Sequence, residues 1–519
     1  MKTATSRVNP LQSRLNQKTA GPPVVSWLCL MFGAILLLFA DGRNTIPLAA
    51  WLAPALILRF VRTQPAWRGL SVGYLVMIIF RAVAVRGMIP IPGIFYYIFL
   101  VISGVSTLLP YVADRLAATH LKGVLNTLVF PCTLVAMQFI YSHGPVGSWG
   151  SIPYTQSGNL PLLQLLSVAG LWGITFLIGW FASVVNWTWE QGFGDRRSRL
   201  PLLLFAAVYV AVILLGGARL VLFPPAAPTV RIASLSPTKE GAKISGDLLQ
   251  AVVQEKASED QITDFRLAAN AGATGLLARS EREAIAGAKI IVWSETAAYV
   301  LKEDEASLLG RGSALAAKYH VYLGMTLGTW TPGAKLPLEN KLVLIEPTGE
   351  IAWQYLKARA TPGPETAMAV KSDGQLRQLA TNYGKLDGAI CYDMDFPKLM
   401  AQAGDQRADV VLSPAGDWRA IDPRHTEIAS FRAIEQGFNL VRQSNGGLSA
   451  AYDFQGRRLA SMDEYQSADL TMIAEVPTRG TRTIYSVLGD WLAWLCVLGA
   501  LTLIIAAWRN ARRSTLRST

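Results

Sequence analysis

Long apolar stretches constrain this chain more than any other feature of its sequence. A helix that spans a bilayer needs about 20 mostly apolar residues, because lipid offers no partner for an unpaired backbone group. Eight stretches are long enough, although Arg59, Arg62 and Arg81 lie at or within the ends of the second and third. We therefore predict eight membrane helices, at about residues 24–40, 45–61, 69–85, 89–109, 123–141, 161–185, 201–223 and 485–508.

The composition agrees with a membrane location. Hydrophobic residues make up 51% of the chain and charged residues only 16%, whereas a soluble protein carries about 25% charged residues. The net charge of +12 is first a signal of topology in such a protein. Since the chain has no Arg-rich aromatic motif and no zinc-type Cys/His spacing, we expect no nucleic-acid partner, no metal and no cofactor.

Basic residues set the expected orientation, because cytoplasmic loops are enriched in Lys and Arg. They cluster in the tail 1–23 and again after residue 508, and the loop 142–160 carries none. With eight spans, both tails (1–23 and 509–519) lie in the cytoplasm. The polar region between the seventh and eighth spans, residues 224–484, then lies outside. Further basic clusters agree with this alternation: Arg62 and Arg68, Arg115 and Lys122, and Arg196, Arg197 and Arg199.

Residues 228–480 have the pattern of a separate domain, joined to the membrane domain (24–223) by the stiff Pro-rich segment 223–228. Short β-branched runs alternate with Ala/Glu/Arg-rich stretches, which indicates an α/β layered fold. Hairpin turns are predicted at 347–350 and 454–457, where glycine supplies a positive φ. The predicted strands are 229–236, 288–295, 321–328, 340–346, 386–392 and 408–414, and the predicted helices 259–286 and 423–437.

Three polar residues stand at the ends of predicted strands in this domain: Glu295, Lys357 and Cys391. A thiol is a good nucleophile only as the thiolate, so it needs a base or a neighbouring cation. A carboxylate can take its proton, and an ammonium can stabilise an oxyanion. Taken singly, each residue also fits an ordinary role, as a buried cysteine, a helix-capping glutamate or a solvated lysine. The other cysteines lie in apolar runs: Cys29, Cys132 and Cys496.

The residues around these three resemble a known family. "WSE" (293–295), "YLK" (355–357) and "CYDMDFP" (391–397) are similar to motifs of the carbon–nitrogen hydrolase (nitrilase) superfamily, which uses a Glu–Lys–Cys triad on an αββα sandwich. Seven spans before such a domain and one after it resemble the apolipoprotein N-acyltransferases, membrane-embedded bacterial members of that superfamily. The segments 147–156, 431–460 and 481–491 are similar to that family as well.

The resemblance implies roles for six residues. It makes Glu295 the base, Lys357 the oxyanion-stabilising cation and Cys391 the nucleophile. Glu365, eight residues after Lys357, matches the family's second glutamate and supports the lysine. Tyr392 supplies a backbone amide to the oxyanion. Asp393, next to it in the motif, is a further supporting residue of the site.

The resemblance also implies a reaction, partners and a location. An acyl chain passes from a membrane phospholipid through a cysteine thioester to the N-terminal amine of a diacylglyceryl-cysteine lipoprotein. The enzyme would be a monomer in the bacterial inner membrane, with its catalytic domain on the periplasmic, extra-cytoplasmic side.

Two other functions stay open. Cys391-Tyr392-Asp393 and "SPAGDW" (413–418) are closer to soluble amidases, which favours a membrane-tethered amidase or nitrilase that uses water or another amine as acceptor. A non-catalytic membrane receptor is the third possibility, but a binding module has no need for all three of Glu295, Lys357 and Cys391. His425 follows Asp-Pro-Arg at a predicted helix start, so we expect a surface or capping role for it.

The charged loops make one prediction that is independent of the chemistry. Reporter fusions near residue 230 and near residue 480 should both read as extra-cytoplasmic, and fusions after residue 509 as cytoplasmic, because the basic loops stay inside. Activity of a periplasm-dependent reporter at each point measures this. A cytoplasmic signal at residue 230 would contradict the eight-span arrangement.

Overall fold

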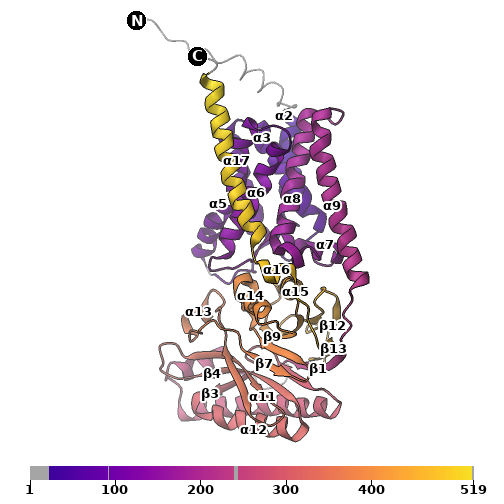
Figure 1. Cartoon of the computed structure of the whole chain (residues 1–519). Helices are drawn as coiled ribbons and strands as arrows, with labels where there is room; N and C mark the ends of the chain where they lie inside the picture. Colours follow the sequence, from indigo (N-terminus) through magenta and orange to yellow (C-terminus); the bar gives the residue numbers. More distant parts are fainter. Residues whose placement is uncertain (1–22, 92, 239–243, 517–519) are drawn as a thin grey trace.

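The computed structural model describes residues 23–91, 93–238 and 244–516. It consists of a bundle of long helices and an α/β domain below it (Figure 1). The predicted basic tail 1–23 lies almost wholly outside the described residues, and so do the last three residues of the chain. The last helix of the chain returns from the α/β domain to run along the bundle.

A helix occupies the place of every predicted span. Six of the described helices are long and apolar enough to cross a membrane. Of the other two, α2 is a shorter apolar helix and α3 contains Arg59 and Arg62. The helices are α2 (Pro23–Leu37), α3 (Pro47–Thr63), α4 (Ala66–Ala84), α5 (Ile94–Ala117), α6 (Val124–Ser142), α8 (Leu166–Gln191), α9 (Arg196–Leu222) and α17 (Trp491–Leu516).

The arginines within the second and third spans all have acidic partners. Arg62 forms a buried ion pair with Asp114 of α5 at 2.7 Å and a second with Glu190 of α8 at 3.3 Å. Arg59 also pairs with Glu190, and Arg81 pairs with Asp41. A charge inside a membrane protein is tolerated when it faces the bundle interior and is paired. The same charges that made these two spans ambiguous in the sequence therefore tie the bundle together.

Two predicted spans differ in outline from the helices observed. The stretch at 485–508 divides into α16 (Ile484–Leu488) and α17, because Gly489 adopts a positive φ of 57° that ends α16. The stretch at 161–185 divides into α7 (Leu160–Leu163) and α8, and α8 itself is kinked at Gly170. A Cβ at Gly170 would overlap the Tyr485 ring, so only glycine allows α16 to pack this closely.

The α/β domain contains two sheets that pack face to face. The first has the strand order β13-β1-β2-β4-β5-β6, with β3 paired to β4, and the second has the order β12-β11-β10-β9-β8-β7. The strands are β1 (Thr229–Leu235), β2 (Ile290–Trp293), β3 (Ala298–Leu301), β4 (Tyr322–Trp330), β5 (Leu338–Ile345), β6 (Ile351–Leu356), β7 (Gln378–Thr381), β8 (Gly384–Gly388), β9 (Val410–Gly416), β10 (Asn439–Asn445), β11 (Leu448–Tyr452), β12 (Arg458–Asp463) and β13 (Thr471–Pro477).

Helices cover the outer face of each sheet. Alternate residues of a strand point to opposite faces, so Ile290 and Val292 enter the core between the sheets, and Ile291 and Trp293 face α11 (Glu259–Ile285) and α12 (Glu305–Tyr319). On the second sheet, α14 (Pro397–Asp405) and α15 (Arg424–Gln436) pack against β9 and β10. This is the predicted αββα sandwich. The short helices α10 (Gly246–Val253) and α13 (Pro364–Met368) lie outside its layers.

The predicted strands are all present, but one ends earlier than expected. The run 386–392 was predicted as a strand with Cys391 at its tip, whereas β8 ends at Gly388 and Cys391 begins the 3₁₀ turn η4 (Cys391–Asp395). β6 was implied by the placement of Lys357 at a strand end, and β11 and β12 by the hairpin turn at 454–457. Strands β3, β7, β10 and β13 were not predicted. β10 was missed because its sequence, NLVRQSN, is mostly polar and lacks the apolar pattern of a buried strand.

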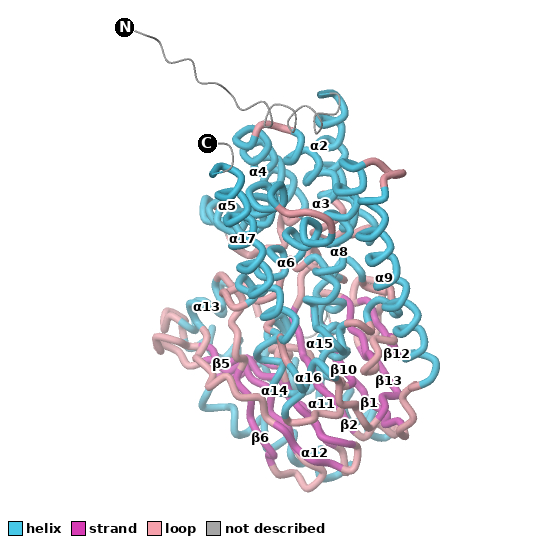
Figure 2. The backbone as a smooth tube through the Cα atoms, turned by 45° about the horizontal axis from the view of Figure 1, so that its top comes forward, coloured by secondary structure: helices cyan, strands magenta, loops and turns pink. Residues whose placement is uncertain are grey.

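Helix α15 joins the two parts of the protein. One face of α15 packs into the core of the α/β domain through Ala429 and Ala433. Another face packs against residues of the membrane bundle such as Leu162, through Ile428, Phe431 and Ile434. Figure 1 shows α14, α15 and α16 between the helical bundle and the strands, and in Figure 2, where the top comes forward, the same helices are drawn across the strands. The side of the second sheet that bears Cys391 therefore faces the membrane domain.

Candidate active site

Glu295 follows β2 and is held in one orientation by three donors. Its Oε1 accepts from Asn340 Nδ2 at 2.8 Å and lies 2.8 Å from Lys357 Nζ, and its Oε2 accepts from the backbone N–H of Gly416 at 2.7 Å. The side chain is only 6% exposed. A carboxylate fixed in this way is suited to a general base, because its geometry does not depend on the substrate.

Lys357 follows β6, and its ammonium lies between two carboxylates. Besides Glu295 it contacts Glu365 Oε2 at 2.7 Å and Thr361 Oγ1 at 3.2 Å. Burial alone would lower the pKa of Lys357, but the negative charges of Glu295 and Glu365 raise it above the ordinary value. The side chain therefore carries a positive charge at every physiological pH, as an oxyanion-stabilising group must.

Asn340, which sequence reasoning missed, connects the two carboxylates. Its Nδ2 donates to Glu295 Oε1 and to Glu365 Oε1, both at 2.8 Å. Glu365 lies on α13 and also accepts from the backbone N–H of Thr361 at 2.8 Å. Lys357 and Glu365 are thus in direct contact, and the same amide holds both glutamates.

Cys391 has a strained backbone that turns its thiol into the site. Its φ is 50°, a value that is uncommon for a residue other than glycine and is typical of functional sites. The carboxylate of Asp393 fixes this turn: it accepts from the backbone N–H of Ile390, from the Tyr355 hydroxyl and from the backbone N–H of Arg359 at 2.8–2.9 Å. Because Arg359 is close to Lys357 in the chain, Asp393 couples the nucleophile's turn to the lysine's segment. Burial raises the pKa of Asp393 to about 6.

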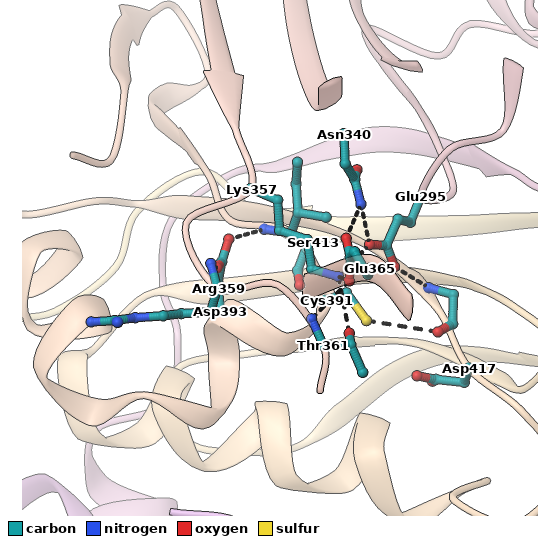
Figure 3. Close-up of polar contacts among 12 residues, drawn as sticks. Glu295, Asn340, Lys357, Arg359, Thr361, Glu365, Cys391, Asp393, Ser413 and Asp417 are labelled. Carbon is teal, nitrogen blue, oxygen red and sulfur yellow. Dashed lines mark hydrogen bonds and ion pairs between the residues drawn. The ribbon is translucent and has the colours of Figure 1, made fainter. Parts of the chain in front are cut away.

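The backbone of Gly416, at the end of β9, contacts both Glu295 and Cys391. Its N–H donates to Glu295 and its carbonyl oxygen lies 3.7 Å from the Cys391 sulfur. Figure 3 shows the sulfur with Glu295 on one side and Asp417 on the other. Burial and the charge of Glu295 hold the pKa of the Cys391 thiol well above its ordinary value, against the opposing effect of Lys357. A base is therefore required to generate the thiolate near neutral pH.

The expectation for His425 was wrong. The side chain is only 3% exposed, with Nδ1 2.6 Å from Asp417 and Nε2 2.8 Å from Asp395. The sequence shows it at a helix start but does not show that two distant aspartates meet it. The signal that was available is the position of both aspartates, each a few residues beyond the end of a predicted strand.

Cys391, Asp417 and His425 are also close enough together to be considered as ligands of a metal ion. One ligand atom each of Cys391, Asp417 and His425 lies within 4.8 Å of the others. Both ring nitrogens of His425 already contact carboxylates, so a metal ion would have to displace one of them. The arrangement fits a hydrogen-bonded network better than a metal site.

Tyr392 lies close to the membrane domain. Its hydroxyl donates to the backbone oxygen of Pro145 at 3.4 Å, in the loop between α6 and α7. A second contact joins the η4 turn to this loop over shorter distances. The backbone oxygen of Asp395 accepts from both the backbone N–H and the hydroxyl of Ser148, each at 2.7 Å. The thiol's turn is therefore anchored directly on the membrane domain.

A model of the carbon–nitrogen hydrolases matches residues 198–485, more than half of the chain, and the chain belongs to this family. A second model, of the apolipoprotein N-acyltransferase N-terminal domain, matches residues 19–184. Both family resemblances found in the sequence are thereby confirmed, and with them the conclusion that the protein is an enzyme.

Individual curated proteins are similar to this chain over most of its length. The chain is 25% identical over 530 residues to an apolipoprotein N-acyltransferase of Geobacter metallireducens, covering 93% of this chain and 95% of that protein. It is 27% identical over 426 residues to one of Bradyrhizobium diazoefficiens, covering 76% and 75%. Among solved structures, an amidase from Nesterenkonia sp. is similar at 17% identity with a TM-score of 0.38, covering 49% of this chain and 92% of that one.

The geometry makes a pH-dependent prediction for Glu295→Gln. The variant loses the base, so acylation of Cys391 at about pH 7 should fall by about 10²-fold or more, the range typical of general-base catalysis. Removing the negative charge also lowers the pKa of the thiol, since Glu295 raises it. Burial still keeps the thiol pKa high, but below that pKa the thiolate fraction rises about tenfold with each pH unit. The rate of the variant should therefore increase from about pH 7 to about pH 9 and recover in part.

The measurement is the rate of acyl-adduct formation across this pH range, with wild type measured alongside as the control. Equal loss at both ends of the range, in a variant that remains folded, would show that Glu295 does more than remove the proton.

Proposed function

We propose that the protein transfers a fatty acyl chain from a membrane phospholipid, through a thioester on Cys391, to the N-terminal amine of a diacylglyceryl-cysteine lipoprotein. The observation that carries the proposal is the position of the thiol. Cys391 lies beside a buried carboxylate and ammonium, and its turn is bonded to the membrane domain through Ser148. The relatives that match most of the chain are apolipoprotein N-acyltransferases, which supports the same reaction.

In the first half-reaction Glu295 takes the proton of Cys391, and the thiolate attacks the carbonyl carbon of the phospholipid ester. The oxyanion that forms is stabilised by the Lys357 ammonium, with the backbone amide of Tyr392 as a further donor. The tetrahedral intermediate then collapses: the C–O bond breaks, Glu295 returns the proton to the departing oxygen, and lysophospholipid leaves. Cys391 now holds the acyl chain as a thioester.

In the second half-reaction the acceptor's amine attacks the thioester carbonyl. The same groups act in reverse, because Lys357 again stabilises the oxyanion and Glu295 removes a proton from the attacking nitrogen. The C–S bond breaks, the thiolate leaves and recovers a proton, and the amide product is released. Glu365 and Asn340 hold Lys357 and Glu295 in place through both steps.

A cavity in the membrane domain fits an acyl substrate. Its volume is about 130 Å³, and apolar side chains of α4, α5 and α6 line most of it, including Met77, Leu100 and Leu134. The Arg81–Asp41 ion pair also lines the cavity, as do Trp149 and Gly150 of the loop that contacts the thiol's turn. A mostly apolar cavity with an ion pair in its wall suits an acyl chain that carries a polar head.

A membrane-tethered amidase is the second candidate. Cys391-Tyr392-Asp393 and the "SPAGDW" segment favour it, and water would then take the place of the lipoprotein amine. The long relatives are acyltransferases, so we place transfer first. The proposal includes a monomer in the bacterial inner membrane with residues 228–480 on the periplasmic side.

The acceptor decides between the two candidates. Purified protein in phospholipid micelles should convert a synthetic diacylglyceryl-cysteine peptide to a product heavier by one acyl chain, as read by mass spectrometry. Cys391→Ala is the matched control and should give no product, because it lacks the nucleophile. An unchanged peptide together with hydrolysis of short aliphatic amides would instead establish the amidase.

A further inference from the structure

His425 is a buried titratable group that the proposed reaction does not use. It lies at the start of α15, between Asp395 of η4 and Asp417 after β9. Burial and the nearby Arg442 lower the pKa of His425, but the two aspartates raise it above the ordinary value. When protonated, the ring can donate from both nitrogens, one to each carboxylate. Its Nδ1 also lies 2.9 Å from the Arg442 guanidinium.

On one side, this link ends at the peptide that holds the base and the nucleophile. Asp417 accepts from His425, from Arg442 at 3.2 Å and from the Ser444 hydroxyl at 2.8 Å. The preceding residue is Gly416, whose N–H and carbonyl contact Glu295 and Cys391. The orientation of Asp417 therefore fixes the orientation of the Gly416 peptide.

On the other side, the link ends at the membrane domain. The backbone oxygen of Asp395 accepts two hydrogen bonds from Ser148. A Cβ at Gly147 would overlap that same oxygen, so the loop is in close contact with the turn. The Trp149 ring packs edge-on against the His425 ring, with centroids 5.6 Å apart, and Trp149 also lines the cavity of the membrane domain.

We infer that His425 is a positioning residue that links the membrane-side loop 147–149 to the Gly416 peptide, and so sets the geometry of Cys391 and Glu295 for acylation. The inference rests on the proposed function, because it makes the membrane-side loop part of the geometry of that reaction. It acts through Asp395 and Asp417 and does not touch the substrate. A misplacement of about 1 Å in such a site lowers a rate by about 10²-fold.

The test uses a small activated ester, p-nitrophenyl butyrate, with the full-length protein in detergent micelles. The burst of p-nitrophenol reports acylation of Cys391 alone and needs neither phospholipid nor lipoprotein. Failure of the acceptor assay would therefore leave this result interpretable. His320→Gln is the matched control, because His320 is an exposed histidine at the end of α12.

His425→Ala should lower the saturating acylation rate by about 10- to 10²-fold. The ester concentration at half-saturation should stay within about twofold of the wild-type value. A thermal unfolding transition should show that the variant is folded. His320→Gln should acylate at the wild-type rate. A wild-type rate in folded His425→Ala would overturn the inference, as would an equal loss in His320→Gln.

A second set of variants separates linkage from packing, and decides alone if His425→Ala does not fold. Asp395→Asn and His425→Gln each break one charged contact. Combined, the two substitutions rebuild a neutral chain: the amide N–H₂ introduced at position 395 donates to the amide oxygen introduced at position 425, and the N–H₂ at position 425 donates to Asp417. The double variant should acylate at least about threefold faster than His425→Gln alone, since coupled residues are non-additive. Losses that simply multiply would show that the residues act independently and would overturn the link.

Discussion

The contact of the Lys357 ammonium with Glu295 and Glu365 is the interaction on which the site depends. Three charged groups are removed from water here, and a buried charge is tolerated only when its partners and hydrogen bonds are nearly complete. Asn340 and the Gly416 N–H supply the remaining donors. Burial and the negative charge of Glu295 keep the Cys391 thiol protonated. In the proposed reaction the Glu295 carboxylate takes this proton, so the proposed base and nucleophile are activated together.

The second constraint is the junction with the membrane domain. Tyr392 and Asp395 contact the loop between α6 and α7. Helix α15 packs into the cores of both parts of the protein, and Cys391 is buried. Exclusion of water from such a site would favour an amine as the acceptor over hydrolysis of the thioester.

The sequence predicted the parts of the structure that follow from local pattern. Apolar length located the membrane helices, and β-branched runs such as 229–236 and 408–414 located the core strands. Cys391 was misplaced at a strand tip because a positive φ at a non-glycine residue leaves no mark in the sequence. His425 and Asn340 were missed because their partners are distant along the chain. β10 was missed because it contributes Arg442 and Ser444 to a buried polar network, which reverses the pattern expected of a core strand.

The central claim is that Cys391 carries the acyl chain, and intact-protein mass spectrometry tests it most directly. After incubation of the purified protein with phospholipid, we predict an adduct with the mass of one fatty acyl group on Cys391, labile to neutral hydroxylamine as a thioester is. Folded protein that gains no adduct, or an adduct of the same mass that persists in Cys391→Ala, would contradict the account.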